Sequence, residues 1–355
     1  MDIYVLNDNF ERVGIIDNYT SLIWNTRYYT PGDFELYVAA DNRILELINN
    51  NTYLVRDKDM QGEEYRNVMI IDKPNIDLQT DVENGDYLTV TGKCLKSIVA
   101  RRVVIHQTIM SGNITDCVNR LLSENIINPT DTKRKINNFT FDTSNTFNVS
   151  LSMQATGDNL AELFTEMLQN YGIGWDVYIK NGKFVFYLYK GVDRSADQSE
   201  NPRVVFSYEF DNLLTSDYKE DVSTYANVAI VAGEGEGVER KKYETGDSSA
   251  TGLNRFEVFV DARDMSTNEG EISTSDYNIM LAEKGNETLS ELQKVITFEG
   301  EIDATRNYVL NRDFYLGDMV QVINEYGISK STRIIEIIEA DDENGESIIP
   351  TFSDF

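Results

Sequence analysis

Three Asn-Gly dipeptides, Asn84-Gly85, Asn181-Gly182 and Asn344-Gly345, lie between short runs of β-branched and aromatic residues. Both residues of such a pair readily adopt a positive φ, which the two-residue type I′ hairpin requires. The neighbouring runs have the composition or the alternation of strands; they cover residues 21–29, 34–38, 68–71, 87–90, 183–189, 227–232 and 256–260. The chain has only five prolines, so few strands are prevented from pairing. The pattern therefore predicts antiparallel sheet.

Helices are few in this pattern, and three are expected. Asp158 is placed to cap a helix that ends at Gly172, with an apolar face of Leu160, Leu163, Phe164, Met167, Leu168 and Tyr171. Asn113 is placed to cap a second helix before Pro129, with the apolar residues Ile114, Cys117, Val118, Leu121, Leu122 and Ile126. A third helix starts at Ser275 and runs to about Val295, although Gly285 counts against it. We expect these apolar faces to pack into the core.

One order of elements recurs near the two ends of the chain: strand, turn, Ile-rich strand, Asn-Gly, strand. It covers residues 53–90 at the front and 319–352 at the end. This similarity predicts two related β-barrel-like units. We expect a first β-barrel-like tube domain over 1–105, a mixed helix-and-hairpin domain over 106–200, and a second tube domain over 201–355 with a helical insertion at about 275–295. The predicted fold class is mainly β with a few helices, a β-rich α+β protein.

The charge of the chain excludes some classes of partner. Its 355 residues include 60 acidic and 32 basic side chains, for a formal net charge of −28. Nucleic-acid phosphates and anionic membrane surfaces repel such a chain. The basic clusters 101–102, 133–135 and 240–242 are short and scattered, so we expect them on solvated faces or beside acidic residues. No run approaches about 18 apolar residues, so we expect no membrane insertion. Because the net charge is strongly negative, we also expect no specific nucleic-acid binding.

The chain has few residues suited to catalysis or metal binding. His106 is its only histidine and follows a β-branched run, so we expect a strand position for it rather than a catalytic role. Cys94 and Cys117 form no CxxC motif, and we expect free thiols rather than a bridge. We therefore expect no metal, no cofactor and no catalytic residue. The first residues also lack the basic and apolar regions of a signal peptide.

Two loops resemble ligand sites but lack the required chemistry. In residues 233–239 glutamates alternate with glycines, which opposes phosphate binding, so we expect a hairpin or loop. Before the acidic turn 341–346, Ala340 stands where a calcium loop needs an oxygen ligand, so we expect a hairpin there as well. Glycoside hydrolysis needs only two carboxylates and aromatic platforms. Carboxylates are too abundant here to be informative, and Trp24 and Trp175 are few for a glycan cleft, so we expect no enzyme.

Several segments together resemble the tail-hub proteins of phages that infect Gram-positive bacteria. Residues 22–36 (Leu-Ile-Trp-Asn-Thr-Arg-Tyr-Tyr-Thr-Pro-Gly-Asp-Phe-Glu-Leu) are similar to the W-x-x-R-Y-x-x-P-G-x-F-E-L opening of that family. Residues 91–102 are similar to G-x-x-L-x-x-x-L-x-x-R, and residues 225–233 with Arg240 to N-V-x-x-V-x-G followed by R. Residues 314–322 and 333–337 are similar to Y-x-L-G-D-x-V and R-I-x-E. This ordered set spans essentially the whole chain.

The resemblance implies a homotrimer at the distal end of a phage tail or tail-like particle. Three subunits with two barrels each would present six similar barrels, and so join a sixfold tail tube to a threefold tip. The implied partners are the tail tube or distal tail protein, the tape-measure protein, and receptor-binding or tip proteins. The hub core has no catalytic residues to transfer. Because the chain ends at Phe355, we expect any lytic or adhesive part to be a separate protein.

An acidic ejection channel would explain much of the charge, because DNA phosphates gain nothing from an acidic lumen. We therefore expect a structural protein of the virion tail tip, made in the bacterial host cytoplasm. Two alternatives stay open: a tail-associated peptidoglycan-degrading enzyme and a host-surface carbohydrate-binding module.

Overall fold

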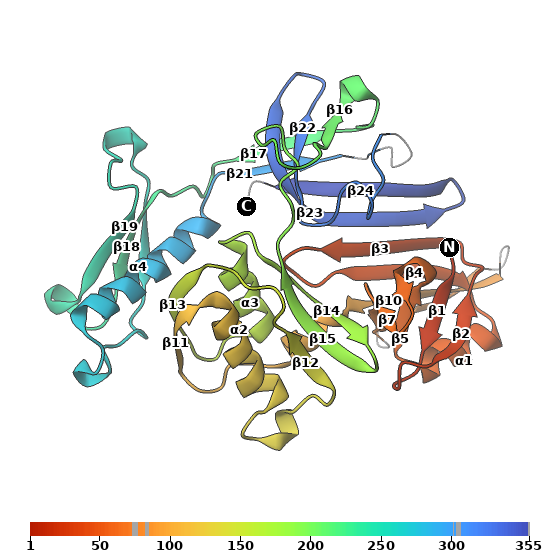
Figure 1. Ribbon diagram of the computed structural model, residues 1–355, viewed down its shortest axis with the longest axis horizontal. Helices are drawn as coiled ribbons and strands as arrows, with labels where there is room; N and C mark the ends of the chain where they lie inside the picture. The colour runs from red at the N-terminus through yellow and green to blue at the C-terminus, as the bar shows by residue number, and fades with distance from the viewer. Residues whose placement is uncertain (73–76, 82–84, 301, 303–306, 354–355) are drawn as a thin grey trace.

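The computed structural model describes the chain except residues 73–76, 82–84, 301, 303–306 and 354–355 (Figure 1). Its main feature is an open 14-stranded sheet with the main order β17-β21-β24-β23-β3-β4-β10-β8-β5-β1-β2. The N-terminal strands are β1 (Ile3–Leu6), β2 (Arg12–Ile16), β3 (Ser21–Arg27), β4 (Asp33–Ala39), β5 (Tyr53–Arg56), β8 (Met69–Ile71), β9 (Asp77–Asp81) and β10 (Gly85–Cys94). The C-terminal strands are β16 (Val205–Ser207), β17 (Asp217–Asp221), β21 (Val295–Glu299), β22 (Met319–Ile323), β23 (Ser329–Asp342) and β24 (Gly345–Ser353). The predicted β-rich α+β class is confirmed, and the described strands form no closed barrel.

The long strand β23 joins the two ends of the chain within this sheet. Residues 329–333 of β23 pair with β22, and residues 336–341 pair with β3. A bulge between Ile334 and Glu336 separates these two stretches. Strands from opposite ends of the sequence therefore lie side by side (Figure 1).

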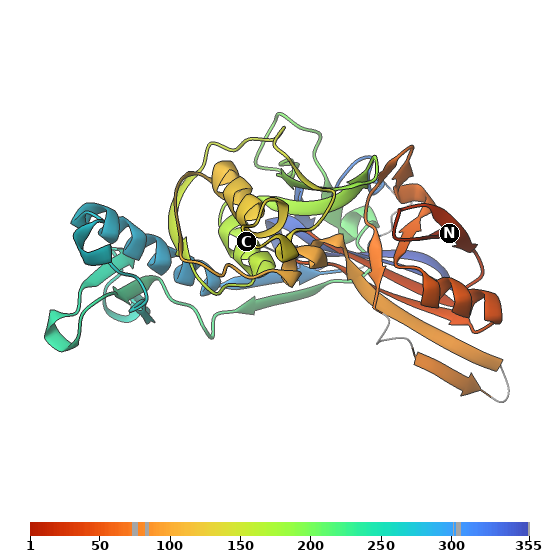
Figure 2. The same ribbon diagram turned by 90° about the horizontal axis from the view of Figure 1, so that it is seen from below.

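The recurring order of elements corresponds to two antiparallel three-stranded meanders. In the first, β8 pairs with β5 and β10; in the second, β23 pairs with β22 and β24. The first meander has one more strand, β9, which pairs with β10 and projects with it from one end of the molecule (Figure 2). The two ends are thus similar in the order of their strands but not identical.

The Asn-Gly dipeptides adopt different turns. Asn181 (φ 49°) and Gly182 (φ 69°) join β14 (Gly174–Lys180) to β15 (Lys183–Tyr189), which confirms the type I′ hairpin. In the β23–β24 hairpin Asp342 pairs with Gly345, and within the dipeptide only Gly345 has a positive φ (111°). The type I′ prediction is wrong there, because a type I′ turn needs a positive φ at both residues of the dipeptide. Asn84 lies outside the described residues.

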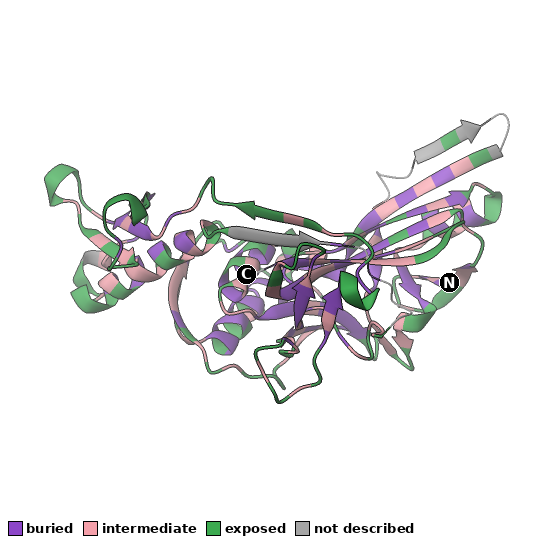
Figure 3. Cartoon of the chain, turned by 90° about the horizontal axis from the view of Figure 1, so that it is seen from above, coloured by how far each residue is buried: buried purple, intermediate pink, exposed green. Residues whose placement is uncertain are grey.

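The middle of the chain forms a second part, which we call the mixed part, and its core also includes Leu6, Val55 and Val68 from the N-terminal part. It contains α2 (Ile114–Leu122), α3 (Leu160–Gln169), the β11–β13 pair and a five-stranded sheet in the order β12-β15-β14-β7-β6. The remaining strands are β6 (Met60–Gln61), β7 (Glu64–Tyr65), β11 (Thr108–Asn113), β12 (Phe139–Asp142) and β13 (Ser150–Ala155). Trp175 and Phe186 stack in its core with ring centroids 5.4 Å apart. Buried residues concentrate where this part and the large sheet overlap (Figure 3).

The ends of α2 and α3 follow the sequence with one correction. The side chain of Asn113 caps α2, as expected. The cap of α3 is Asn159 and not Asp158, because the Asp158 carboxylate accepts a hydrogen bond from the Thr156 amide instead. Gly172 (φ 64°) ends α3 in the Schellman arrangement, as expected.

The third helix, α4 (Thr274–Glu291), is capped by Ser273 rather than started at Ser275. It packs on a separate sheet of β19 (Lys242–Gly246), β18 (Val228–Ala232) and β20 (Glu257–Asp261). These elements share a core drawn from residues 226–292, which we call the inserted unit. It lies at the end of the molecule opposite the β9–β10 hairpin (Figure 2).

Gly285 explains why α4 lies so close to its sheet. A Cβ on Gly285 would lie 2.4 Å from Thr245 Cγ2 and 2.7 Å from Val231 Cγ2. Real Cβ atoms essentially never approach so closely, so a larger residue at this position would force these side chains to shift. The residue that weakens the helical pattern in the sequence is therefore favoured by packing.

Candidate functional site

Several segments of the resemblance meet around Tyr28, the residue after β3. Its side chain is fully buried. The hydroxyl donates toward the carbonyl oxygens of Gly172 (3.1 Å) and Tyr189 (3.2 Å) and accepts from the Gly191 amide (3.2 Å). One side chain of the N-terminal part thus contacts the segments before β14 and after β15. We call the site formed by Tyr28, Lys96, Gly174, Gly317 and Arg333 the junction.

Two glycines make room for the Tyr28 ring. A Cβ on Gly174 would lie 2.3 Å from Tyr28 Cε2, and a Cβ on Gly317 would lie 2.2 Å from the same atom. Gly317 also has a φ of 95°, which L side chains rarely adopt. Gly174 belongs to β14 and Gly317 precedes β22, so the ring is held between the mixed part and the C-terminal strands.

Arg333 of β23 closes the junction from the C-terminal side. Its Nη1 donates to Gly317 O at 2.5 Å, and its guanidinium carbon lies 5.6 Å from the Tyr28 ring centroid. The neighbouring Asp318 accepts from the Val192 amide at 2.7 Å and from Arg194 Nε at 2.8 Å. These contacts attach the end of the mixed part to the turn before β22.

Lys96 holds the loop after β3 from the N-terminal side. Its buried ammonium donates to the carbonyl oxygens of Arg27 (2.6 Å) and Tyr28 (3.1 Å), and it lies 5.1 Å from the Trp175 ring centroid. Burial lowers the pKa of Lys96, and the nearby Asp176 opposes that shift. The carbonyl oxygens supply the hydrogen bonds that a buried ammonium needs.

Two arginines connect N-terminal strands to β23. Arg27 Nε lies 2.6 Å from Glu336 Oε1. Arg56 is fully buried; its Nη1 lies 2.7 Å from Glu339 Oε1, and its guanidinium carbon lies 4.9 Å from the Trp24 ring centroid. We did not identify Arg56 or Glu339 from the sequence. The available signal was a cation within the apolar run at residues 53–56.

The junction positions three parts of the chain relative to one another. It joins the N-terminal strands, the mixed part and the C-terminal strands through buried hydrogen bonds and close backbone contacts. In the part of the chain that the structure describes, no three His, Cys, Asp or Glu side chains form a group that could hold a metal ion. None of the described helices has the length and apolar composition to span a membrane.

One known protein family matches nearly the whole chain. The profile of the Siphovirus ReqiPepy6 Gp37-like protein family matches residues 2–353. The chain belongs to this family. No curated protein sequence matches it.

The Gp37-like chain also shares its fold with solved phage tail proteins. The tail protein from Neisseria meningitidis MC58 has a TM-score of 0.61 at 11% identity, with 99% of this chain and 96% of that chain covered. The 43 kDa tail protein of prophage MuSo2 from Shewanella oneidensis has a TM-score of 0.60 at 12% identity, with 99% and 98% covered. Prophage tail protein gp18 from Listeria monocytogenes EGD-e has a TM-score of 0.56 at 13% identity, with 100% and 95% covered. The expected membership of a phage tail protein family is confirmed, and the restriction to Gram-positive hosts stays a prediction.

The remaining candidate residues of the Gp37-like chain do not belong to the junction. His106 is exposed in a bend before β11, so the expected strand position is wrong. Cys94 and Cys117 are buried free thiols. Cys94 Sγ accepts from the Gly32 amide at 3.1 Å, and burial raises the pKa of Cys94 to about 11. Residues 233–239 connect β18 to β19, as a loop was expected to do.

The basic clusters 101–102 and 133–135 are distant in the sequence but meet in the Gp37-like fold. Arg102 Nε donates to Arg134 O at 2.8 Å, and Arg134 Nη2 donates to Val103 O at 2.5 Å. Burial, together with the positive charges of Arg134 and Arg101, lowers the pKa of Arg102. The third cluster pairs with acidic residues, as expected: Arg240 bonds to Asp261.

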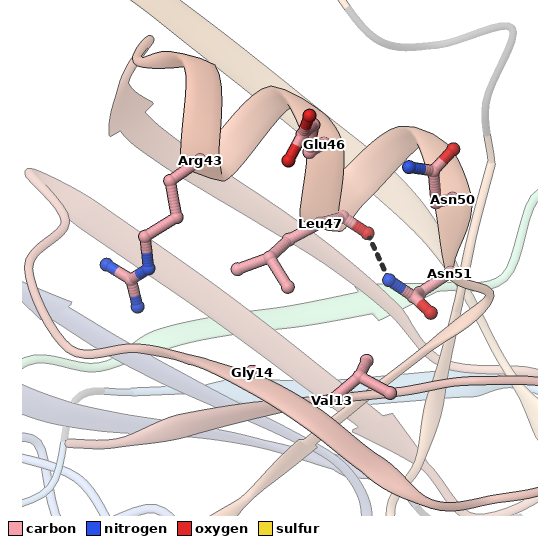
Figure 4. A pocket seen from close by; sticks show the side chains of 7 residues that line it. All are labelled: Val13, Gly14, Arg43, Glu46, Leu47, Asn50 and Asn51. Carbon is pink, nitrogen blue, oxygen red and sulfur yellow. Dashed lines mark hydrogen bonds between the residues drawn. The ribbon is translucent and has the colours of Figure 1, made fainter.

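A small hollow of about 290 Å³ lies between α1 (Asn42–Asn50) and β2 (Figure 4). The Leu47 side chain points toward Gly14, where a Cβ would lie 2.4 Å from Leu47 Cδ2. Arg43 donates to Ile15 O at 2.5 Å. The absence of a side chain at Gly14 therefore allows α1 to pack against β2.

Proposed function

We propose that this Gp37-like chain is a structural tail-hub protein at the distal end of a phage or phage-like tail. The observation that carries the proposal is the fold shared with tail proteins over at least 99% of the chain, together with the family match over residues 2–353. The protein acts by shape and interface. It assembles as a homotrimer that joins the sixfold tail tube to the threefold tip.

The two meanders support the trimeric arrangement. Each chain supplies a β5–β8–β10 and a β22–β23–β24 unit with the same antiparallel pairing order. Three copies therefore present six similar units around one axis. The junction and the β3–β23 pairing support a fixed spacing between the two units of each chain.

The charge supports a role beside passing DNA. With a net charge of −28, an acidic lumen repels phosphates and does not retain the genome during ejection. The partners are the tail tube or distal tail protein, the tape-measure protein and the receptor-binding or tip proteins. The division of each chain near residues 105 and 200, and a host among Gram-positive bacteria, belong to the same proposal.

The oligomeric state of the purified chain tests the trimer. Native mass spectrometry is expected to show three 40.5 kDa chains, and negative-stain images are expected to show rings with a central hole. A dimer or a monomer at every concentration would contradict the ring.

A cell-wall turbidity assay tests the enzymatic alternative. The chain is expected to leave the turbidity of a cell-wall suspension unchanged. A fall in turbidity that disappears on replacement of one specific carboxylate would show a hydrolase and overturn the structural role. Binding of the isolated chain to a glycan array would instead favour a carbohydrate-binding module.

A further inference from the structure

A cleft with a volume of about 760 Å³ lies between the mixed part and the inserted unit. It separates α3 and β13 on one side from α4 on the other. α4 runs beside β13, so the two walls are held near each other (Figure 1). The cleft has no role in the contacts that form the junction.

Methionines from both walls form the floor of this cleft. Met153 and Met167 come from the mixed part, and Met265 and Met280 come from the inserted unit. Four of the nine methionines of the chain therefore line one cleft. Methionine side chains are flexible and polarisable, so a surface of this kind adapts to the apolar side chains of a partner.

The rim of the cleft is acidic. Glu166 of α3 faces Glu287 of α4, and the cation on this side is Lys284, whose Nζ lies 2.7 Å from Glu287 Oε2. Asp158, Asp264 and Glu283 also line the cleft, and the carboxylate of Glu291 acts electrostatically on Glu166. One ammonium does not balance this many carboxylates, so the rim carries negative charge that a cationic partner would neutralise.

From the methionine floor and the acidic rim we infer that the cleft docks a segment of another protein. That segment presents a large apolar side chain flanked by lysine or arginine. The apolar side chain rests on Met153, the half-buried methionine of the four, and the flanking cations lie against Glu166 and Glu287. Recognition thus combines adaptable apolar contact with charge complementarity.

Titration of the rim gives the interaction a pH dependence. Burial and the neighbouring Glu287 carboxylate raise the pKa of Glu166 to about 7. A cationic segment favours the deprotonated carboxylate, so binding tightens as the pH rises through that value and releases a proton.

A labelled synthetic peptide of leucine and lysine, arranged as an amphipathic helix, serves as the probe in a fluorescence anisotropy titration of the full chain. Wild type is expected to bind it, and the variant Glu166→Lys/Glu287→Lys is expected to weaken the affinity by about tenfold or more. Met153→Ser, at a half-buried position, is expected to weaken it as well. Circular dichroism confirms that each variant folds.

The control variant separates this site from general attraction to an acidic chain. Glu209→Lys/Glu236→Lys changes the net charge equally at two exposed positions and is expected to keep the affinity within about twofold. Wild-type affinity is expected to rise between about pH 6 and about pH 8, and Glu166→Gln is expected to remove that rise. Equal losses in the two lysine variants, or no binding by wild type, would overturn the inference while leaving the hub proposal in place.

Discussion

The guanidinium of Arg56 and the carboxylate of Glu339 lie 2.7 Å apart although 283 residues separate them in the sequence. Arg56 also lies 2.5 Å from Asp59 and stacks over Trp24, so the contact between β5 and β23 is both charged and buried. Arg56 and Lys58 lower the pKa of Glu339 against the opposing effect of burial. The stability that this carboxylate contributes is therefore present above its unfolded pKa and lost as the pH falls.

Replacing Arg56 tests how much this ion pair between the two ends of the chain contributes to the free energy of unfolding. Arg56→Met leaves Glu339 and Asp59 without their buried cation, so the free energy of unfolding is expected to fall by about 3–5 kcal/mol. Lys58→Met is the control, because Lys58 is 37% exposed and its contact with Glu339 is expected to contribute less than about 1 kcal/mol. Denaturant unfolding measures both, and equal losses would contradict a special role for Arg56.

Gly174 offers a test of the junction, because its backbone conformation is ordinary and the three atoms nearest to an added Cβ all belong to the Tyr28 ring. Gly174→Ala is expected to lower the free energy of unfolding by about 1–3 kcal/mol through overpacking. In a Tyr28→Ala background the same substitution should be nearly neutral, since the clash is gone. A double-mutant cycle with no coupling would show that the ring and the glycine do not constrain each other.

Replacement of Gly285 by alanine is expected to change stability in the direction opposite to that predicted by helix propensity. Alanine within a helix is favoured over glycine by about 1 kcal/mol. Gly285→Ala is nevertheless expected to destabilise the chain by about 1–2 kcal/mol, because its Cβ meets Thr245 and Val231. Adding Thr245→Ser removes one contact while keeping the hydroxyl that bonds to Asn286, so thermal unfolding should recover in part. A stabilising Gly285→Ala would contradict the close packing of α4.

Glu166 makes stability depend on pH in a defined direction. Its pKa is raised to about 7 in the folded chain, so the stabilising contribution of its neutral form is full below its unfolded pKa and lost as the pH rises toward 7. Glu166→Gln should remove this loss and leave the variant about 1 kcal/mol more stable near pH 8, after allowance for solvent screening. The exposed Glu209→Gln is the comparison, and identical pH profiles for wild type and Glu166→Gln would refute the assignment.

Local patterns predicted the strands and helices well because both depend on short-range periodicity. The alternation at 183–189 and the Asn181-Gly182 pair specify β15 and its turn without outside help. The cap of α3 was misplaced by one residue, since Asp158 and Asn159 are both suitable side chains and only the fold decides between them. Errors of this kind are small because the helix itself is fixed by its apolar face.

Long-range pairing could not be predicted from the sequence. Nothing local to β3 states that residues 336–341 lie beside it, nor that β18 pairs in parallel with β20 to make the sheet beneath α4. The junction was not predicted for the same reason. Gly174 and Gly317 are distant from Tyr28 in the sequence, and only the folded structure shows that both make room for its ring. The family motifs contain Tyr28, Lys96, Gly317 and Arg333 but not Gly174, and they do not indicate that these residues meet.

The most direct test of the tail-hub role is electron microscopy of particles carrying an epitope-tagged copy of the chain, located with gold-labelled antibody. The proposal predicts label at the distal tip of the tail and threefold density there in averaged images. Label along the length of the tube, or its absence from assembled tails, would contradict a hub.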